Sequence, residues 1–268
     1  MHGTGNDFVL LDLRGQKFEL GAEKASAMAN RSTGIGCDQI LVLKAASDPS
    51  CLLDFEVWNA DGSRALQCGN GVRCIGLYLR SRGETDHNTF TIRGPVSIIS
   101  LQETEPGMFR VNMGPPRFEP ENIPINLAAT DGNYELTLGG KLFKLGAVSM
   151  GNPHALLEVP AIEAADLAGL GAEISRHPAF PNGCNAGFAQ VIDRNTIRLR
   201  VFERGAGETM ACGSGACAAV SILIERGKLN KEVLVNQVGG ALIIEWDGGE
   251  EPVMMTGSAN HLFVGTLI

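Results

Sequence analysis

The sequence lacks the features that mark membrane, secreted and nucleic-acid-binding proteins. Its longest apolar run, residues 216–224 with one serine, is far shorter than a membrane span. The first residues contain no basic segment followed by an apolar core, so we recognise no secretory signal. A net charge of −8 disfavours a nucleic acid or an anionic membrane as the main partner. With 44% apolar residues in 268, we expect an ordinary globular protein of one or two domains.

Motifs for metals and cofactors are missing as well. No Cys-x-x-Cys pair occurs among the seven cysteines, which argues against a structural zinc site or a thioredoxin-like motif. No phosphate-binding glycine loop with a following lysine is present, and no lysine has a setting that indicates a Schiff base with pyridoxal phosphate. An odd number of cysteines without a secretory signal indicates reduced thiols in the cytoplasm. We therefore expect no metal and no cofactor.

What the chain does contain is one motif twice. Cys68-Gly69-Asn70-Gly71 and Cys212-Gly213-Ser214-Gly215 are each followed by an apolar stretch that ends in Arg-Gly. Two shorter turns repeat in the same order: Gly5-Asn6-Asp7 with Gly151-Asn152-Pro153, and Gly36-Cys37-Asp38 with Gly183-Cys184-Asn185. We interpret the chain as a duplicated unit.

A cysteine where a helix begins has unusual chemistry. The first N–H groups of a helix are unpaired and carry partial positive charge, which favours the thiolate and lowers the pKa. Glycines let the same N–H groups approach and hold a carboxylate. If both motifs held one carboxylate, Cys68 and Cys212 would flank its α-carbon and could exchange protons with opposite faces. Packing in the core is the simpler interpretation of the other five cysteines, Cys37, Cys51, Cys74, Cys184 and Cys217.

Short strands dominate the predicted secondary structure. Apolar and β-branched runs bounded by turn formers predict strands over residues 8–13, 40–44, 53–58, 96–101, 110–113, 137–148, 188–192, 197–202, 233–235, 241–246 and 262–267. Helices are predicted over residues 22–31, 72–82, 162–176 and 216–226. The two helices after the cysteine motifs are apolar on most faces, so we expect the strands of each half to wrap around them.

Proline marks the predicted domain boundary. Residues 114–124 contain four prolines, which a regular element does not tolerate, and they lie near the middle of the chain. We expect an N-terminal half of residues 1–113, to which residues 258–268 return, and a C-terminal half of residues 114–257.

Polar residues cluster near both motifs. Arg204 could pair bidentately with a carboxylate, although a surface ion pair with Glu208 is the simpler interpretation of the residue alone. His154 could cap a turn or handle a proton. Four asparagines follow turns or strand ends, where asparagine is usually a turn former; they are Asn6, Asn59, Asn152 and Asn185.

Together these segments resemble a known family. MHGTGNDFVLLD, GIGCDQI, WNADGS, QCGNGVRC, VNMGPP, GAVSMGNPH, NAGFAQ and ERGAGETMACGSGACAA are similar, from end to end, to segments of bacterial diaminopimelate epimerases. The resemblance implies an α+β fold of two pseudo-symmetric domains, each a curved, mostly antiparallel sheet wrapped around a central helix, with the site between them. It also implies a cytoplasmic homodimer that interconverts LL- and meso-diaminopimelate, without a cofactor, for lysine and peptidoglycan synthesis.

The resemblance assigns roles to residues of this sequence. It implies that Cys68 and Cys212 are the acid and base, assisted by His154 and Glu203. It places the α-carboxylate on backbone N–H groups of Gly69, Asn70, Gly213 and Ser214. Further substrate contacts are expected from Asn6, Gln39, Asn59, Asn152, Asn185, Glu203 and Arg204.

Two other functions are compatible with the motifs. A racemase of the same architecture could act on proline, hydroxyproline or another amino acid, but Arg204 and the asparagines favour a substrate with a second charged end. A thiol redox sensor would need only a reversible disulfide between Cys68 and Cys212. Appearance of solvent deuterium at the substrate α-carbon distinguishes an epimerase from a sensor.

Overall fold

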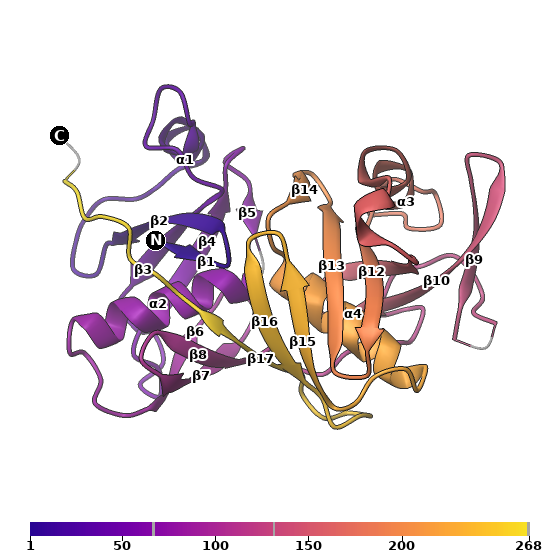
Figure 1. The fold of residues 1–268 in the computed structure, drawn as a ribbon. Helices are drawn as coiled ribbons and strands as arrows, with labels where there is room; N and C mark the ends of the chain where they lie inside the picture. Colours follow the sequence, from indigo (N-terminus) through magenta and orange to yellow (C-terminus); the bar gives the residue numbers. More distant parts are fainter. Residues whose placement is uncertain (66–67, 131, 267–268) are drawn as a thin grey trace. The chain divides into compact units, whose positions relative to one another are not determined.

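The chain divides into two compact units. The computed structural model describes residues 1–65, 68–130 and 132–266. Unit 1 comprises Met1–Asn112 and Thr256–Ile268, and unit 2 comprises Met113–Met255. Both chain ends therefore belong to unit 1, and unit 2 is one uninterrupted segment (Figure 1). Within the described residues, no helix is both long enough and apolar enough to cross a membrane.

Unit 1 is built on a mixed sheet. Its elements are β1 (His2–Gly3), β2 (Asn6–Asp12), α1 (Ala22–Ala29), β3 (Gln39–Lys44), β4 (Asp54–Asn59), β5 (Arg64–Ala65), α2 (Gly69–Ser81), β6 (Thr89–Arg93), β7 (Ile98–Glu105) and β8 (Met108–Asn112). β2 pairs with β3 in parallel, and β4 is antiparallel to β3 and β5. β4 then pairs in parallel with β6, which begins an antiparallel run through β7 to β8.

Unit 2 repeats this order of pairings. Its strands are β9 (Tyr134–Leu138), β10 (Lys141–Ser149), β11 (Pro153–Glu158), β12 (Asn185–Asp193), β13 (Thr196–Glu203), β14 (Gly207–Thr209), β15 (Glu232–Gln237) and β16 (Gly240–Glu245), and β17 (Met254–Ser258) follows them. β11 and β12 are parallel, β13 is antiparallel to β12 and β14, β13 and β15 are parallel, and β16 is antiparallel to β15. The helix α4 (Gly213–Glu225) occupies the position of α2 in this order. The predicted α+β fold of two similar halves is confirmed.

The two long helices begin and end alike. Each begins directly after its motif cysteine, so the predicted cysteine-led helix starts are confirmed. Each ends at a glycine with φ of +67°, Gly83 and Gly227, a backbone conformation that favours glycine. The N–H of each glycine donates to a carbonyl of the last turn, at 3.0 Å from Arg80 O and 2.8 Å from Ile224 O respectively. Local sequence therefore sets both ends of both helices.

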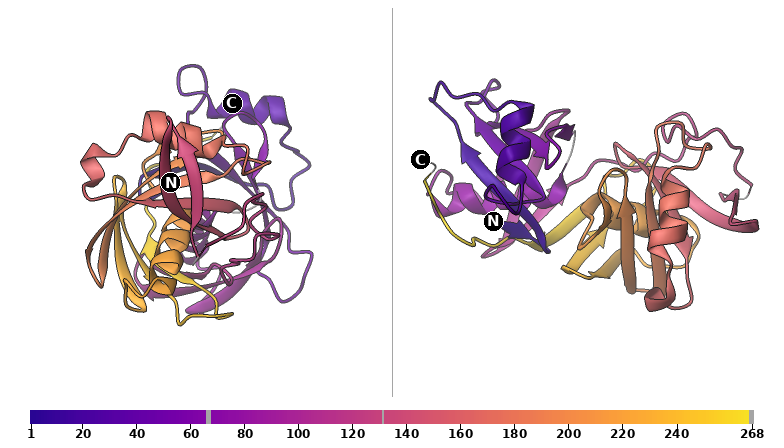
Figure 2. Two further views of the ribbon diagram at one scale, coloured as in Figure 1. Left: turned by 90° about the vertical axis from the view of Figure 1, so that its right-hand side faces the viewer. Right: turned by 90° about the horizontal axis from the view of Figure 1, so that it is seen from above.

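The helix α4 is almost entirely buried within unit 2. It packs against β10, β11, β12, β13 and β16, and two further views show strands of its own unit around it (Figure 2). Its one buried hydroxyl, that of Ser221, donates to Cys217 O at 2.9 Å, so no unpaired polar group opposes burial there. The prediction of a strand-wrapped apolar helix is confirmed.

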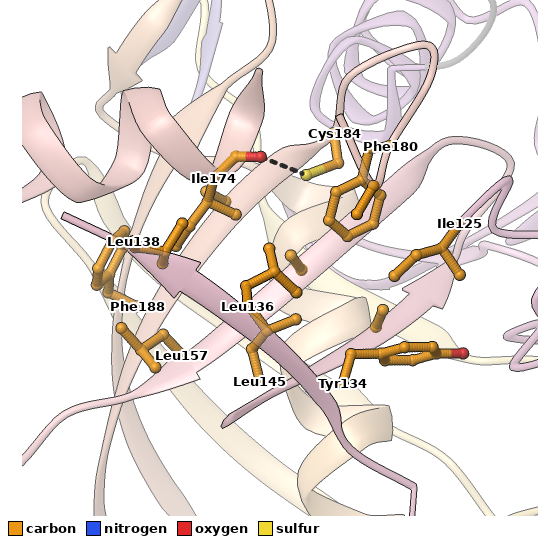
Figure 3. Packing of buried hydrophobic residues seen from close by; sticks show 14 of the residues in the cluster. Ile125, Tyr134, Leu136, Leu138, Leu145, Leu157, Ile174, Phe180, Cys184 and Phe188 are labelled. Carbon is orange, nitrogen blue, oxygen red and sulfur yellow. Dashed lines mark hydrogen bonds between the residues drawn. The ribbon is translucent and has the colours of Figure 1, made fainter. Parts of the chain in front are cut away.

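A second apolar cluster of unit 2 lies beneath the β9–β10 hairpin (Figure 3). Leu136 and Leu145 from this hairpin belong to the cluster together with Phe188 and Ile174. Cys184 belongs to this cluster, is fully buried, and donates its S–H to Ile174 O at 3.5 Å. Burial raises the pKa of Cys184 to about 12, so this thiol is a packing group. In unit 1, α1 forms a smaller cluster with β3 and β4.

Most predicted strands are confirmed within a few residues, but two were wrong. The single strand over residues 137–148 is the β9–β10 hairpin, because Gly139 and Gly140, with φ of +53° and +76°, form its turn. Residues 262–266 form no strand, and residue 267 of that prediction lies outside the described residues. The strands β1, β5, β6, β11, β14 and β17 were not predicted.

The predicted helix over residues 162–176 was also wrong. The segment is a 3₁₀ turn (Ile162–Ala164), a π turn (Leu167–Gly171) and the short α3 (Ala172–Ser175). Asp166 interrupts it by accepting a hydrogen bond from Gly169 N at 2.8 Å, a local bond that competes with a continuous helix.

Candidate active site

The first candidate thiol caps α2. Cys68 has an extended backbone (φ −153°, ψ 93°), and its Sγ accepts a hydrogen bond from Gly71 N at 3.4 Å. A Cβ at Gly71 would lie 2.8 Å from Leu41 Cδ2, so the glycine lets the start of the helix lie close to β3. Cys68 is half-buried.

Neutral amides surround Cys68. Asn6 Oδ1 accepts the Cys68 S–H at 3.8 Å and the Asn70 amide at 3.4 Å. Gln39 Nε2 donates to Asn59 Oδ1 at 2.9 Å, because these residues are opposite each other where β3 meets β4. Asn70 Oδ1 is buried and has no hydrogen-bond partner within the described chain, so it is an acceptor available to a ligand. In unit 1, Asn6 and Asn70 therefore lie at the start of α2 beside Cys68, while Gln39 and Asn59 bond to each other where β3 meets β4.

A charged ring that was not predicted to belong to the site lies behind these amides. Asn6 Nδ2 donates to Asp38 Oδ2 at 3.0 Å, and Arg31 pairs with both Asp38 and Asp7. Both aspartates follow the repeated glycine turns, so the repeats themselves were the available signal. The Asp38 carboxylate accepts from the amide that faces the thiol, and the Asp7 carboxylate binds Arg31 and the Asp38 N–H.

The second candidate cysteine, Cys212, occupies the N-cap position of α4 and is buried, but unlike Cys68 its side chain makes no capping hydrogen bond. Cys212 is 4% exposed, and its N–H donates to Gln237 Oε1 at 2.8 Å. Ser214 Oγ lies 3.7 Å from the Cys212 sulfur. A Cβ at Gly215 would lie 3.2 Å from that sulfur and 3.0 Å from Val201 Cγ2, so this glycine also makes room for the cap. Gln237 was not predicted, and a lone glutamine on a late strand gave no signal for it.

The structure corrects the expected chemistry of Cys212. Burial raises its pKa well above the usual value for a thiol, and the Glu203 carboxylate raises it further. The Gly215 N–H and the Ser214 hydroxyl oppose this rise without cancelling it. The expected lowering of its pKa was therefore wrong for Cys212, because loss of solvent and the Glu203 charge outweigh the two hydrogen bonds. In this conformation Cys212 is a protonated thiol.

His154 lies beside the second helix start. Its Nε2 is 3.0 Å from Asn152 Oδ1, 3.1 Å from Ser214 Oγ and 3.5 Å from Asn185 Nδ2. Burial lowers its pKa to about 3, with a smaller contribution from the Arg204 charge. The imidazole is therefore neutral near pH 7 and acts through hydrogen bonds.

Glu203 and Arg204 leave the end of β13. Thr209 Oγ1 donates to Glu203 Oε1 at 2.6 Å, and Arg204 N–H donates to Asn185 Oδ1 at 2.8 Å. The Arg204 guanidinium donates to Asn182 O at 2.6 Å and has no ion-pair partner among the residues described. The alternative pair with Glu208 does not form, because that carboxylate binds Arg200.

Arg204 also lines a cavity of unit 2. The cavity has a volume of about 620 Å³ and is lined by a second arginine, Arg176, and by Phe180 and Phe202. None of its lining residues is acidic. The predicted residues of this unit, including the α4 start at Gly213 and Ser214, thus form a second polar cluster next to a cationic cavity.

The fold of the chain is that of known racemases and epimerases. The structure of a probable proline racemase from Agrobacterium radiobacter K84 matches with a TM-score of 0.68 at 14% identity. The match covers 96% of this chain and 88% of that one. A hydroxyproline epimerase from Agrobacterium vitis matches with a TM-score of 0.67 at 14% identity, over 96% of this chain and 87% of that one. The chain therefore shares the fold of these proteins.

Sequence comparison identifies the family among proteins of this fold. The diaminopimelate epimerase family model matches residues 1–119 and 146–262. The diaminopimelate epimerase of Thioalkalivibrio sulfidiphilus is 45% identical over 100% of this chain and 97% of its own length. That of Coxiella burnetii is 44% identical over 99% of this chain and 96% of its own. The chain belongs to the diaminopimelate epimerase family, and the predicted resemblance is confirmed.

Proposed function

We propose that this protein is an isomerase that interconverts LL- and meso-diaminopimelate by cofactor-independent proton transfer between Cys68 and Cys212. The observation that carries the proposal is the cysteine-capped, glycine-bearing helix start, which occurs in both units of a chain with epimerase relatives. One cysteine, as thiolate, abstracts the α-proton, and the other, as thiol, delivers a proton to the opposite face. The roles exchange in the reverse direction.

The helix starts would stabilise the charge that develops during abstraction. Removal of the α-proton moves negative charge towards the carboxylate, which we assign to the N–H groups of Gly69, Asn70, Gly213 and Ser214. Preorganised donors of this kind are typically worth about 3–4 kcal/mol each. The protonated state of Cys212 supports a role as proton donor in the direction in which Cys68 abstracts.

His154 and Glu203 would assist on the side of Cys212. The neutral imidazole contacts Ser214, and the Glu203 charge acts on the sulfur, so both groups can adjust the proton affinity of that thiol. Neither has an ionisable counterpart at the matching positions of unit 1, where Phe8 and Asn59 lie.

Arg204 would select the distal end of the substrate. A guanidinium binds a carboxylate bidentately, and Arg204 has no acidic partner among the described residues. We assign the distal carboxylate to Arg204 with Asn59 and Asn185, and further substrate contacts to Asn6, Gln39 and Asn152. Proline has no distal carboxylate for this guanidinium to bind. The site therefore favours diaminopimelate over proline, although a probable proline racemase shares the fold.

The cellular setting follows from the family and remains part of the proposal. We assign the protein to lysine and peptidoglycan precursor synthesis in the cytoplasm, as a homodimer. The two functional halves are residues 1–113 with 258–268, and residues 114–257, each supplying one cysteine.

One experiment tests the reaction against both alternatives. The purified protein is incubated with LL-diaminopimelate in heavy water, and configuration and α-deuterium are followed together. We expect meso product carrying solvent deuterium. Activity on proline or hydroxyproline in its place would favour the racemase. Absence of exchange, together with a reversible Cys68–Cys212 disulfide, would favour the redox sensor.

A further inference from the structure

The side chain of Asn6 lies between the Cys68 thiol and a carboxylate. Its Oδ1 accepts from Cys68 Sγ at 3.8 Å and from Asn70 Nδ2 at 3.4 Å. Its Nδ2 donates to Asp38 Oδ2 at 3.0 Å. The two ends of one amide therefore contact two chemically different groups.

Asp38 determines which end of this amide faces the cysteine. The terminal torsion of asparagine is broad and roughly two-fold, so an amide alone could present either oxygen or nitrogen. An ionised carboxylate only accepts hydrogen bonds, so Asn6 must turn its NH₂ towards Asp38. Its oxygen then faces Cys68.

Asp38 is itself held in place from three directions. Arg31 Nη2 donates to Asp38 Oδ1 at 2.8 Å and to Asp7 Oδ1 at 2.7 Å. Asp38 N–H donates to Asp7 Oδ1 at 2.7 Å, and Asp7 N–H donates to Asp38 Oδ2 at 3.1 Å. The carboxylate that orients Asn6 therefore has a fixed position of its own.

The corresponding turns of unit 2 carry no such carboxylates. Pro153 stands where unit 1 has Asp7, and neither Cys184 nor Asn185, the two residues nearest the place of Asp38, is acidic. Asn152, the counterpart of Asn6, contacts His154 through its Oδ1. This arrangement is therefore a feature of the Cys68 half.

We propose that Asp38 is a positioning residue for the epimerase reaction, which fixes the Asn6 amide with its oxygen towards Cys68. The proposal rests on the function proposed above. The oxygen accepts the S–H while the thiol is protonated, and it is placed to accept from a donor such as an α-ammonium group. Arg31 and Asp7 act one step further out, by holding Asp38.

The test is Asp38→Asn, which keeps the shape and removes the obligatory acceptor. The new amide can donate to Asn6 Oδ1, so Asn6 can reverse and turn its NH₂ to the sulfur. We expect kcat/KM to fall about tenfold, the size expected for loss of one charge-assisted hydrogen bond. We also expect iodoacetamide to alkylate Cys68 several-fold faster at fixed pH, because an N–H donor favours the thiolate. Peptide mass spectrometry assigns the alkylated residue.

Loss of a nearby negative charge would by itself speed alkylation, so a double-mutant cycle separates the two causes. In an Asn6→Ala background, Asp38→Asn should change the alkylation rate little. An equal rise in both backgrounds would mean that Asp38 acts only as a charge and would overturn the proposal. Wild-type values of alkylation and kcat/KM in Asp38→Asn would overturn it as well.

Two further variants show whether a change in Cys68 alkylation comes from Asp38 itself, and neither depends on measuring epimerase activity. Arg31→Gln leaves the Asp38 carboxylate but releases it, so it should shift alkylation in the same direction by less. Asp12→Asn is the matched control, because Asp12 lies on the same strand, β2, as Asn6. Its carboxylate accepts from Arg14 and Tyr78 and not from Asn6. It should leave Cys68 alkylation unchanged. Should the wild type lack epimerase activity, the proposed function fails while the alkylation cycle still tests the role of Asp38.

Discussion

Units 1 and 2 share a backbone plan but differ in the chemistry placed on it. In unit 1, adjacent strands align Phe8, Gln39 and Asn59, which are all neutral. In unit 2, the same pairings align His154 with Asn185, and Ala186 with Phe202, so that Asn185 lies beside Glu203. The duplicated fold therefore supplies two similar helix starts, but the strand ends beside the first are neutral, whereas those beside the second carry His154 and Glu203.

The difference shows how two helix starts of the same sequence pattern can hold unequal thiols. Cys68 is half-buried and contacts the Asn6 amide. Cys212 is buried, the Glu203 carboxylate raises its pKa, and Ser214 links it to the neutral His154 imidazole. A proton donor and a proton acceptor must differ in state at any moment of the reaction. The surroundings of the caps, rather than the caps themselves, provide that difference.

The largest effect is expected from the caps. Cys68→Ala and Cys212→Ala should each lower kcat for epimerisation by about a thousandfold, within the range of general acid–base contributions. Cys74→Ala is the control, because this cysteine is buried six residues further along α2 and should cost only stability. Full activity in both single variants would refute the two-cysteine mechanism.

Arg204 has no counterpart in unit 1, where Ala60 follows Asn59. Arg204→Lys keeps the charge but loses the bidentate fork, so we expect kcat/KM to fall about a hundredfold, mostly through KM. Steady-state kinetics on diaminopimelate measures this. Wild-type behaviour would show that Arg204 does not bind the distal carboxylate.

Glu203 is the charged group that acts on the Cys212 thiol, and the matching position of unit 1 has the neutral Asn59. Glu203→Gln should lower the pKa of Cys212, since the carboxylate raises it, and should reduce kcat about tenfold. The pH dependence of thiolate absorbance, compared with a Glu203→Gln, Cys212→Ser double variant, isolates this thiol. An unshifted titration would assign the raised pKa to burial alone.

The glycines test how alike the caps are. Gly71→Ala would press on Leu41, and Gly215→Ala on both Val201 and the Cys212 sulfur. Each should lose about 1–3 kcal/mol of stability by overpacking. Only Gly215→Ala moves a sulfur directly, so it should show the larger fall in kcat at equal loss of stability. Gly21→Ala, which meets no atom within 4 Å, is the control for denaturant melts.

The smallest effect at neutral pH is expected from the protonation of His154. Its pKa falls from 6.5 to about 3 on folding, so the unfolded chain binds more protons between these values. Stability should therefore be full above pH 6.5 and decline as the pH falls towards about 3. His154→Phe, which copies Phe8, should flatten this decline in denaturant midpoints measured across the range. An unchanged slope would mean that His154 is not the group responsible.

Sequence alone predicted the parts of this molecule that depend on local pattern. Cysteine followed by Gly-x-Gly predicted both helix starts, because capping depends on neighbouring residues. The same local reasoning went wrong over residues 137–148, where two adjacent glycines form a turn inside an apolar run.

Contacts between distant residues could not be predicted. Gln237 accepts the Cys212 N–H across 25 residues, and Asp38 orients Asn6 across 32. The raised pKa of Cys212 likewise depends on burial, which is decided by the packing of a whole unit. The order of residues along the chain does not show which distant residues will come into contact.

The discontinuity of unit 1 has a consequence for how the chain folds during synthesis. His2 and Asn260 hydrogen-bond to each other's backbone, and Arg73 Nε donates to Ser258 O at 3.2 Å. Unit 1 cannot form these bonds until all of unit 2 has been translated. Closing so long a loop costs little more than closing a short one, since each doubling of length adds only about 0.6 kcal/mol. The half that carries Cys68 therefore completes its contacts only after the last residue of unit 2 has been added to the chain.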